Sequence, residues 1–530
     1  ATYAKKIGKH NFSVMVGQTW SEYNYYTIGG SGANILNTNP NNWYLSSATS
    51  DLTESADGVS RTRRLSFLGR AFYSYDDRYM ATVNFRADAS SKFTDPWGYF
   101  PSASLAWRMS QEPWMQDYGF IDNLKLRLGY GRVGNDGVGD HAFAANIFSG
   151  GKVFVGYPLG VKQELAYGAA MLTQVNTSGK WETNEQWDAG IDFGFWNGKL
   201  SGTIDYFRRN TLDALMYVNA PAQVGNRYSM VKNVGNIRNE GVEVSLAHEN
   251  TVGKVHYNIG ANFSYIHNEV TAVNGGSPLW GDRTKTDVGM GLNSFWGYEY
   301  EGVYGSDEEA LQHLYAYTAE TINVHAGDAK YKDRNEDGKI DDDDKTVIGN
   351  PFPKFTYGLN FGIDFYGVDI QLFFQGAAGN QIYNAQREYL EGSGTSYAIA
   401  TDAADKIWVG YTEDVKARLI ASGVNYYALN LENRTGTIPN PYGASTNVAN
   451  STRFIENGDY FRLKNVQIGY TFPKKWTEKF YCNRLRVYMT ASNLFTITGY
   501  RGYDPEVGGG VDYGNYPQSR TFTFGLNVTF

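Results

Sequence analysis

The chain has 530 residues, among them 41 Tyr, 60 Gly and one Cys, and a formal net charge of −8. The single cysteine, Cys482, excludes an internal disulfide framework and any multi-cysteine metal site. A protein that binds nucleic acid is expected to carry a basic face, so the negative net charge argues against nucleic acid as a partner. No apolar run reaches the about 18 residues of a transmembrane helix.

Short segments with alternating polarity follow one another from the N-terminus. Residues 1–8 are predicted to be the end of one strand, and a connection at Asn197-Gly198 is a strong hairpin signal. Further strands are predicted at 11–27, 63–75, 79–89, 100–109, 124–130, 187–195, 200–208, 242–246, 255–265, 460–472 and 485–496. The chain therefore consists mainly of strands.

The clearest alternation is the hairpin at residues 354–375, with its turn at Tyr366-Gly367. One face of its first strand carries Tyr357, Leu359, Phe361, Ile363 and Phe365, and the other carries Gly, Asn and Asp. A period of two separates the two faces of a sheet. Because the pattern recurs up to the final strand at 521–530, it predicts an all-β fold, a transmembrane antiparallel β-barrel with lipid outside and water inside.

The connections alternate between a few residues and many tens of residues. In outer-membrane barrels the long ones face the exterior. We expect external loops at about 28–58, 136–183, 210–236, 269–353, 379–458 and 498–518. An aromatic segment at 295–304 and a short helix at 307–314 belong to the fourth loop. The aromatic content, 15% Phe, Trp and Tyr, suits the girdles of such a barrel.

The strand count is odd. About fifteen strands span the membrane if residues 295–304 are external, and about sixteen if they span. The last strand runs inward, which places both ends of the 269–353 loop outside and favours fifteen. Bacterial barrels have an even count. We therefore expect residues 1–530 to be the C-terminal part of a longer barrel.

Several motifs carry a family resemblance, and they span nearly all of the chain. They are WGYFPS at 97–102, NEGVE at 239–243, GDAKYKDRNEDGKID at 327–341, TVIG at 346–349, FQG at 374–376 and SNLFT at 492–496. In this set and order the chain resembles SusC-type TonB-dependent transporters of Bacteroidetes outer membranes.

This resemblance implies a barrel of about 22 strands around an N-terminal plug domain. The plug and about seven strands would lie outside this sequence. It also implies that TonB supplies energy through the plug and that a SusD-like surface lipoprotein caps the barrel. The implied function is import of a nutrient oligomer, an oligosaccharide or an oligopeptide.

An acidic loop at 333–344 matches the template of a calcium loop. Side-chain or backbone oxygens at template positions belong to Asp333, Asn335, Asp337, Lys339, Asp341 and Asp344. The template ends in Glu, and the shorter Asp344 leaves Mg²⁺ as an alternative to Ca²⁺. We expect a metal here to rigidify an external loop. The alternative is a solvated acidic loop.

Substrate contacts are expected from external loops, where aromatic rings stack on sugar faces or apolar side chains. The candidates are Tyr26, Trp43, Trp280, Trp296, Tyr383 and Trp408. For each of them the alternative is a place in a girdle or in the core of a loop. We find no nucleophile elbow, HExxH pair or phosphate-binding glycine loop, and we expect no catalysis and no organic cofactor.

Two other functions stay open. One is a passive sixteen-stranded porin, which requires residues 295–304 to span the membrane and predicts an open channel. The other is a structural or adhesion protein of the outer membrane, which predicts no flux. The family motifs and the odd strand count favour the transporter.

Overall fold

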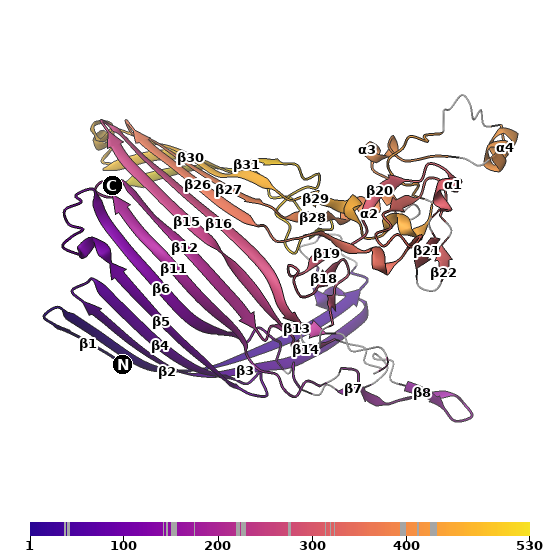
Figure 1. Cartoon of the computed structure of the whole chain (residues 1–530), viewed down its shortest axis with the longest axis horizontal. Helices are drawn as coiled ribbons and strands as arrows, with labels where there is room; N and C mark the ends of the chain where they lie inside the picture. The colour runs from indigo at the N-terminus through magenta and orange to yellow at the C-terminus, as the bar shows by residue number, and fades with distance from the viewer. Residues whose placement is uncertain are drawn as a thin grey trace.

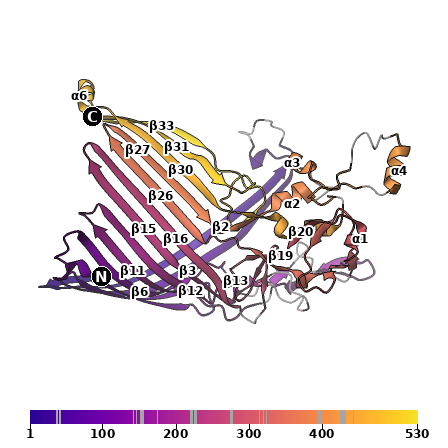
Figure 2. The same ribbon diagram turned by 45° about the horizontal axis from the view of Figure 1, so that its top comes forward.

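The computed structural model shows one large curved sheet with folded loops gathered at one end (Figures 1 and 2). It describes the whole chain except residues 36–38, 40–42, 141, 145–146, 150–155, 174, 219–222, 224–228, 274–276, 313, 318–319, 323, 393–398, 411–412, 424–431 and 442. No helix among the described residues is both long and apolar enough to cross a bilayer.

The sheet has 15 strands, each hydrogen-bonded to its neighbours in chain order. They are β1 (Thr2–Ile7), β2 (His10–Ala33), β3 (Ser50–Tyr75), β4 (Tyr79–Ser90), β5 (Trp97–Arg108), β6 (Ile121–Asn135), β11 (Glu182–Phe195), β12 (Leu200–Leu212), β15 (Gly235–Val252), β16 (Val255–Val273), β26 (Phe355–Phe365), β27 (Val368–Ala378), β30 (Tyr460–Thr471), β31 (Arg484–Thr498) and β33 (Thr521–Thr529). The count of fifteen wall strands is confirmed. Residues 295–304 lie outside this wall, as predicted.

The wall has an apolar face and a polar face. Val83, Leu105 and Leu128 share one face of β4, β5 and β6, and each is more than half exposed. Arg127, Asp192 and Asp205 share the opposite face of β6, β11 and β12. Large exposed apolar side chains on one face of a closed sheet meet lipid, and charged ones on the other meet water. We call the two faces the lipid face and the lumen face.

Tight turns join the strands at one end of the wall. Asp76 and Asp77 adopt positive φ between β3 and β4, and Tyr366 and Gly367 do so between β26 and β27. Two successive positive φ values match the twist of the flanking strands in a two-residue hairpin turn. The longest connections lie at the other end, which we call the loop end (Figure 1).

The first hairpin is longer than predicted. Residues 28–33 and 50–58, expected to be loop, continue β2 and β3, and the pairing reaches Ala33 with Ser50. β4 accompanies β3 only as far as the pair Arg64 and Ser90. A two-stranded ribbon therefore extends past the wall. Its backbone hydrogen bonds require no apolar alternation, which is why a Gly/Ser-rich sequence gave no strand signal.

The other elements belong to the loops. The helices are α1 (Asp307–Ala310), α2 (Ala385–Gly392), α3 (Thr401–Ala404), α4 (Glu413–Ala421) and, at the turn end, α6 (Lys474–Thr477). The strands are β7 (Ile147–Ser149), β8 (Gly156–Leu159), β9 (Glu164–Tyr167), β10 (Ala169–Met171), β13 (Leu215–Val218), β14 (Met230–Asn233), β17 (Leu279–Trp280), β18 (Thr284–Thr286), β19 (Ser294–Gly297), β20 (Tyr300–Val303), β21 (Leu314–Tyr317), β22 (Glu320–Ile322), β23 (Ala329–Tyr331), β24 (Lys339–Ile340), β25 (Thr346–Gly349), β28 (Gln381–Asn384), β29 (Ile455–Asn457) and β32 (Val511–Asp512). The helix predicted at 307–314 is confirmed for its first turn.

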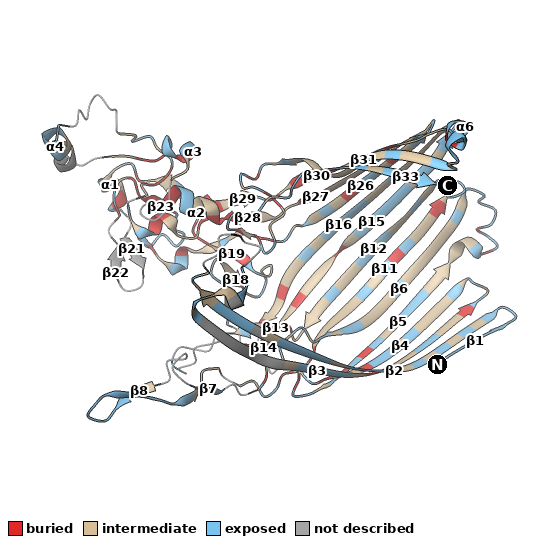
Figure 3. Ribbon diagram, turned by 180° about the vertical axis from the view of Figure 1, so that it is seen from behind, coloured by how far each residue is buried: buried red, intermediate tan, exposed pale blue. Residues whose placement is uncertain are grey.

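Three long loops lie at residues 274–353, 379–458 and 499–520, and their described residues make up one body, which we call the lobe. β28 and β32 pair in parallel between the second and third loops, and Tyr298 bridges Ser451 between the first and second. Phe295, Tyr383 and Phe454 form a core with no exposed surface. The buried residues of the lobe stand out against the half-exposed wall in Figure 3. A second cluster of Phe93, Phe100, Phe143, Trp181 and Val231 holds other loops at the same end.

Candidate functional site

The lumen face carries ion pairs that cross whole strands. Arg127 in β6 donates from Nε to Asp192 at 2.8 Å and from Nη2 to Asp205 in β12 at 2.8 Å. Gly190 of the intervening β11 lies opposite both Arg127 and Asp205. A Cβ on Gly190 would lie 2.0 Å from the Asp205 carboxylate. The bridge therefore requires glycine at this position.

A second bridge repeats the arrangement near the C-terminus. Arg486 in β31 donates to both carboxylate oxygens of Asp369 in β27, at 2.9 and 2.5 Å. It passes over Gly469 of β30, where a Cβ would lie 2.5 Å from the Arg486 guanidinium. Bidentate Arg–carboxylate pairs are directional as well as charged. The polar lumen face is thereby held in one geometry.

Cavities line this face and its loop end. One of about 550 Å³ is bordered by Asp205, Glu243, Asn262 and Gln375. Another of about 780 Å³ lies where the wall meets the loops, and Asn268, Asn350 and Lys354 contribute to it. Both present amides and charges to the interior. Such surfaces suit a hydrated polar ligand better than an apolar one.

Arg283 joins the three loops of the lobe. Its Nη2 bonds Glu388 at 2.8 Å, and its guanidinium carbon lies 5.0 Å from the Tyr383 ring centroid and 5.4 Å from that of Tyr513. Burial lowers the pKa of Arg283, but the hydrogen bonds and charges of Glu388 and Tyr383 together outweigh it and raise that pKa above its ordinary value. For the Tyr383 hydroxyl, which is neutral until it loses its proton, burial raises the pKa. The loops meet around a permanent cation.

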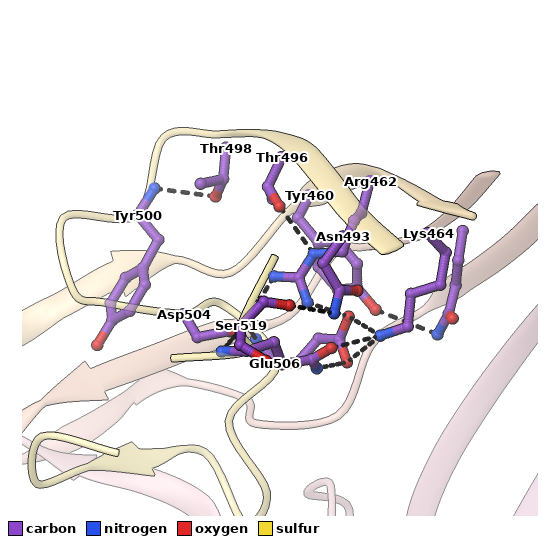
Figure 4. A network of polar contacts seen from close by, with 12 residues as sticks. Tyr460, Arg462, Lys464, Asn493, Thr496, Thr498, Tyr500, Asp504, Glu506 and Ser519 are labelled. Atoms are coloured by element: carbon purple, nitrogen blue, oxygen red, sulfur yellow. Dashed lines mark hydrogen bonds and ion pairs between the residues drawn. The ribbon is translucent and has the colours of Figure 1, made fainter. Parts of the chain in front are cut away.

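A buried network ties the last loop to the wall (Figure 4). Arg462 in β30 is 4% exposed and donates to Asp504, Glu506 and Thr496, each at 2.7 Å. Burial raises the pKa of Asp504, but the bonds from Arg462 and from the backbone N–H groups of Glu506 and Gln518 outweigh it and hold this pKa below its usual range. Wall and lobe are therefore joined through fully paired charges.

The acidic loop is ordered by its own carboxylates. Asp333 accepts hydrogen bonds from the backbone N–H groups of Glu336 and Gly338, at 2.7 and 2.8 Å. Asp344 is fully buried and accepts from the N–H groups of Arg334 and Asp341. Three more predicted ligands each accept a hydrogen bond from the backbone N–H two residues further on. Asn335 accepts from Asp337, Asp337 from Lys339, and Asp341 from Asp343.

These bonds orient the predicted metal ligands toward the backbone. Within the described part of the chain, no three His, Cys, Asp or Glu side chains converge closely enough to hold an ion. The Ca²⁺ or Mg²⁺ assignment stays a prediction. The turn itself needs glycine at Gly338, whose φ is +80°.

Two aromatic candidates meet in the lobe. Trp280 and Trp296 lie 6.3 Å apart, ring to ring, at an interplanar angle of 74°. The Lys285 ammonium lies 5.3 Å from the first ring and 4.3 Å from the second. Trp280 is 61% exposed. The pair and its cation share one face of the small sheet β17-β18-β19-β25, opposite the Phe295 side chain.

The other four candidates do not join this pair. Tyr26 and Trp43 are exposed, the first on the ribbon and the second in the loop that follows β2. Tyr383 has no exposed surface, and Trp408 is nearly as buried. For these two the structure supports the alternative of loop core, because protein atoms already cover the rings.

Sequence reasoning missed Arg283, Arg462 and Asp504. Arg462 was visible as a charge within a predicted strand, a position that costs free energy unless a partner is present. Its partners lie 42 and 44 residues away, and Arg283 and Glu388 are 105 residues apart. No local spacing connects residues at such separations.

The sequence pattern of a family described as "TonB dependent receptor-like, beta-barrel" matches residues 2–494. The TonB-dependent receptor SusC of Bacteroides thetaiotaomicron is 28% identical over 554 aligned residues, which cover 100% of this chain and 49% of that protein. A TonB-dependent receptor of Formosa agariphila is 29% identical, with 100% of this chain and 51% of its own length covered. The chain spans about half the length of these relatives.

Solved structures of a peptide transporter, RagAB, share the fold. One aligns with a TM-score of 0.80 at 24% identity and covers 100% of this chain and 54% of its own. A second, in an "open-open" state, aligns with a TM-score of 0.77 at 25% identity, with the same coverage. Wall and lobe thus share the fold of about half of the matching chain in these transporters.

Proposed function

Because the chain belongs to the TonB dependent receptor-like β-barrel family, we propose that it supplies wall and extracellular lobe to an outer-membrane importer energised through TonB. Its location is the outer membrane, where the relatives' barrels lie. The cargo is a nutrient oligomer, either an oligosaccharide or an oligopeptide. A SusD-like lipoprotein completes the external face.

One observation carries this proposal: the family match extends over residues 2–494, which include most of the wall and two of the three loops of the lobe. The organised lobe supports a receptor, because its three loops share a buried core and the Arg283 joint. A passive porin needs no such body over its mouth. The polar cavities of the lumen face support a hydrated cargo.

The test is uptake by cells that produce the protein from its native gene. Labelled oligosaccharide and labelled oligopeptide are offered separately, with and without a protonophore. We expect accumulation of one class, lost when the proton gradient collapses, because TonB draws on that gradient. Uptake that persists without the gradient identifies a porin. Absence of uptake of either class identifies a structural or adhesion protein.

For cargo contact we propose Trp280 and Trp296. Their perpendicular rings and the adjacent Lys285 offer an apolar face and a donor together, which suits a sugar ring or a peptide side chain. We expect Trp280→Ala to raise the half-saturating cargo concentration about fivefold, because a stacking contact contributes about 1 kcal/mol.

The matched control is Trp476→Ala. Trp476 is 59% exposed, close to Trp280 at 61%, but belongs to α6 at the opposite end of the wall. Equal effects of the two substitutions would mean that an exposed tryptophan affects uptake by anchoring the barrel in the membrane. In that case the pair is no cargo site, while the gradient-dependent uptake still stands by itself.

A further inference from the structure

A row of charges crosses the lipid face at the loop end. Three of them lie two residues beyond an aromatic side chain of the lipid face on the same strand: Trp20 and Glu22 in β2, Tyr130 and Arg132 in β6, Tyr206 and Arg208 in β12. Residues i and i+2 of a strand share a face. The charges therefore point outward to the membrane, one step nearer to the exterior than the aromatic girdle.

The charges are cross-strand pairs. Glu22 pairs with Arg63 of β3 at 2.8 Å, and Arg132 pairs with Glu185 of β11 at 2.8 Å. Arg208 faces Glu240 of β15 at 3.9 Å. We call these three arginines and their glutamates the belt. The three pairs lie on strands from β2 to β15, so the belt follows much of the wall.

In each pair the arginine is more exposed than its glutamate. Side-chain exposures are 56% against 23% for Arg63 and Glu22, and 42% against 19% for Arg132 and Glu185. Arg63 reaches Glu22 through Nε, and Arg132 reaches Glu185 through Nε and Nη2. A guanidinium has five N–H donors in a rigid fork. Each fork therefore keeps donors for another acceptor, and in the Arg63 and Arg132 pairs the hydrogen-bonded glutamate fixes the orientation.

We propose that the belt binds the phosphate groups of outer-leaflet lipids. A phosphate at the headgroup level presents several acceptor oxygens, and Arg–phosphate hydrogen bonds are short, charge-assisted and often bidentate. Beside hydrocarbon such bonds are screened less than in bulk water. The aromatic girdle sets the depth, and the belt then holds the headgroups that lie directly above it.

The experiment uses the full protein, purified in detergent, and two probes. These are diphosphorylated lipid A and the same lipid with both phosphates removed, each titrated while binding is measured. Three variants are compared with wild type: Arg63→Gln/Arg132→Gln/Arg208→Gln, Glu22→Gln/Glu185→Gln/Glu240→Gln, and the control Arg486→Gln, whose arginine pairs with Asp369 on the lumen face. Circular dichroism first establishes that each variant is folded.

We expect the arginine variant to bind diphosphorylated lipid A at least about tenfold more weakly than wild type. The glutamate variant should bind it as tightly or more tightly, because its guanidinium groups are released. Arg486→Gln should match wild type, and the phosphate-free lipid should bind weakly to all.

Three results would overturn the proposal: wild-type affinity in the arginine variant, equal binding of the phosphate-free lipid, or an equal loss in the glutamate variant. The last would mean that the pairs only brace the wall. Competition by inorganic phosphate as effective as that by lipid A would make free phosphate the ligand and overturn the lipid source. None of these outcomes depends on what the protein imports.

Discussion

The wall exposes large apolar side chains, whereas the lobe buries them. On the wall, Phe522, Phe524 and Leu526 are more than half exposed, as are many other apolar side chains of the lipid face. In the lobe, Phe295 and Phe454 have no exposed surface at all. The wall uses lipid as the apolar environment that the lobe must build from its own side chains. The wall is therefore stabilised by burying apolar side chains in lipid, and the lobe by burying them among its own residues.

The two regions also use charge differently. Ion pairs on the wall, such as Arg127 with Asp205, lie on a wet face and fasten strands that already belong to one hydrogen-bonded sheet. Arg462 and Asp504 are 4% and 8% exposed and join segments with no shared sheet. Losing a charge therefore matters more at the lobe than on the wall.

The largest effect should come from the lobe core. We expect Phe454→Ala to lower the free energy of unfolding of the lobe by about 3–5 kcal/mol, because it leaves a cavity. Hydrogen exchange of lobe amides measures this. The matched change Phe524→Ala, on the lipid face, should leave lobe exchange unchanged. Equal effects would remove the distinction between the two regions.

The joint between the regions should come next. Arg462→Gln leaves the buried carboxylate of Asp504 without its cation, and we expect the last loop to lose about 3 kcal/mol of docking free energy. Limited proteolysis within residues 499–520 reports the release. An uncut loop in the variant would show that β32 pairing alone suffices.

The same joint should depend on pH. Because the pKa of Asp504 is lowered in the folded protein, its stabilising contribution is complete above the unfolded value of about 3.9. That contribution is lost as the pH falls from there through the lowered pKa. Proteolysis of the loop should rise over this acid range in wild type and stay flat in Asp504→Asn. A wild-type loop equally protected throughout would contradict the assignment.

A substitution on the wall should act more weakly. Gly190→Ala places a Cβ against the Asp205 carboxylate, and we expect it to cost about 1–3 kcal/mol as the Arg127 bridge shifts. Gly69→Ala in β3 is the control, since a Cβ there has no neighbour within 4 Å. Chemical denaturation in detergent compares the two. Identical midpoints would mean that the bridge adds nothing to the backbone ladder.

The smallest effect concerns the predicted metal. At ten times its dissociation constant, Ca²⁺ would stabilise the lobe by about 1.4 kcal/mol. Thermal unfolding with Ca²⁺ and with a chelator measures this, and Asp333→Asn should abolish the difference. If chelation changes nothing in wild type, the backbone hydrogen bonds of Asp333 and Asp344 alone order this loop.

The sequence by itself determined the wall. Alternation along residues 357–365 and 522–530 requires two unlike environments on the two faces of a sheet. The spacing of turns determined which strands are neighbours, because antiparallel strands joined by short turns pair in chain order. The count of fifteen and the external place of residues 295–304 both followed from these local signals.

Only the tertiary structure decided the lobe. Whether Tyr383 is a surface ring or a core ring depends on Phe295 and Phe454, and the role of Arg283 depends on Glu388, which is 105 residues away. The environment of a strand residue alternates with a period of two, and the sequence shows this period as alternating apolar and polar residues. A folded loop gets its environment from distant segments, and loop closure over many tens of residues leaves no periodic trace.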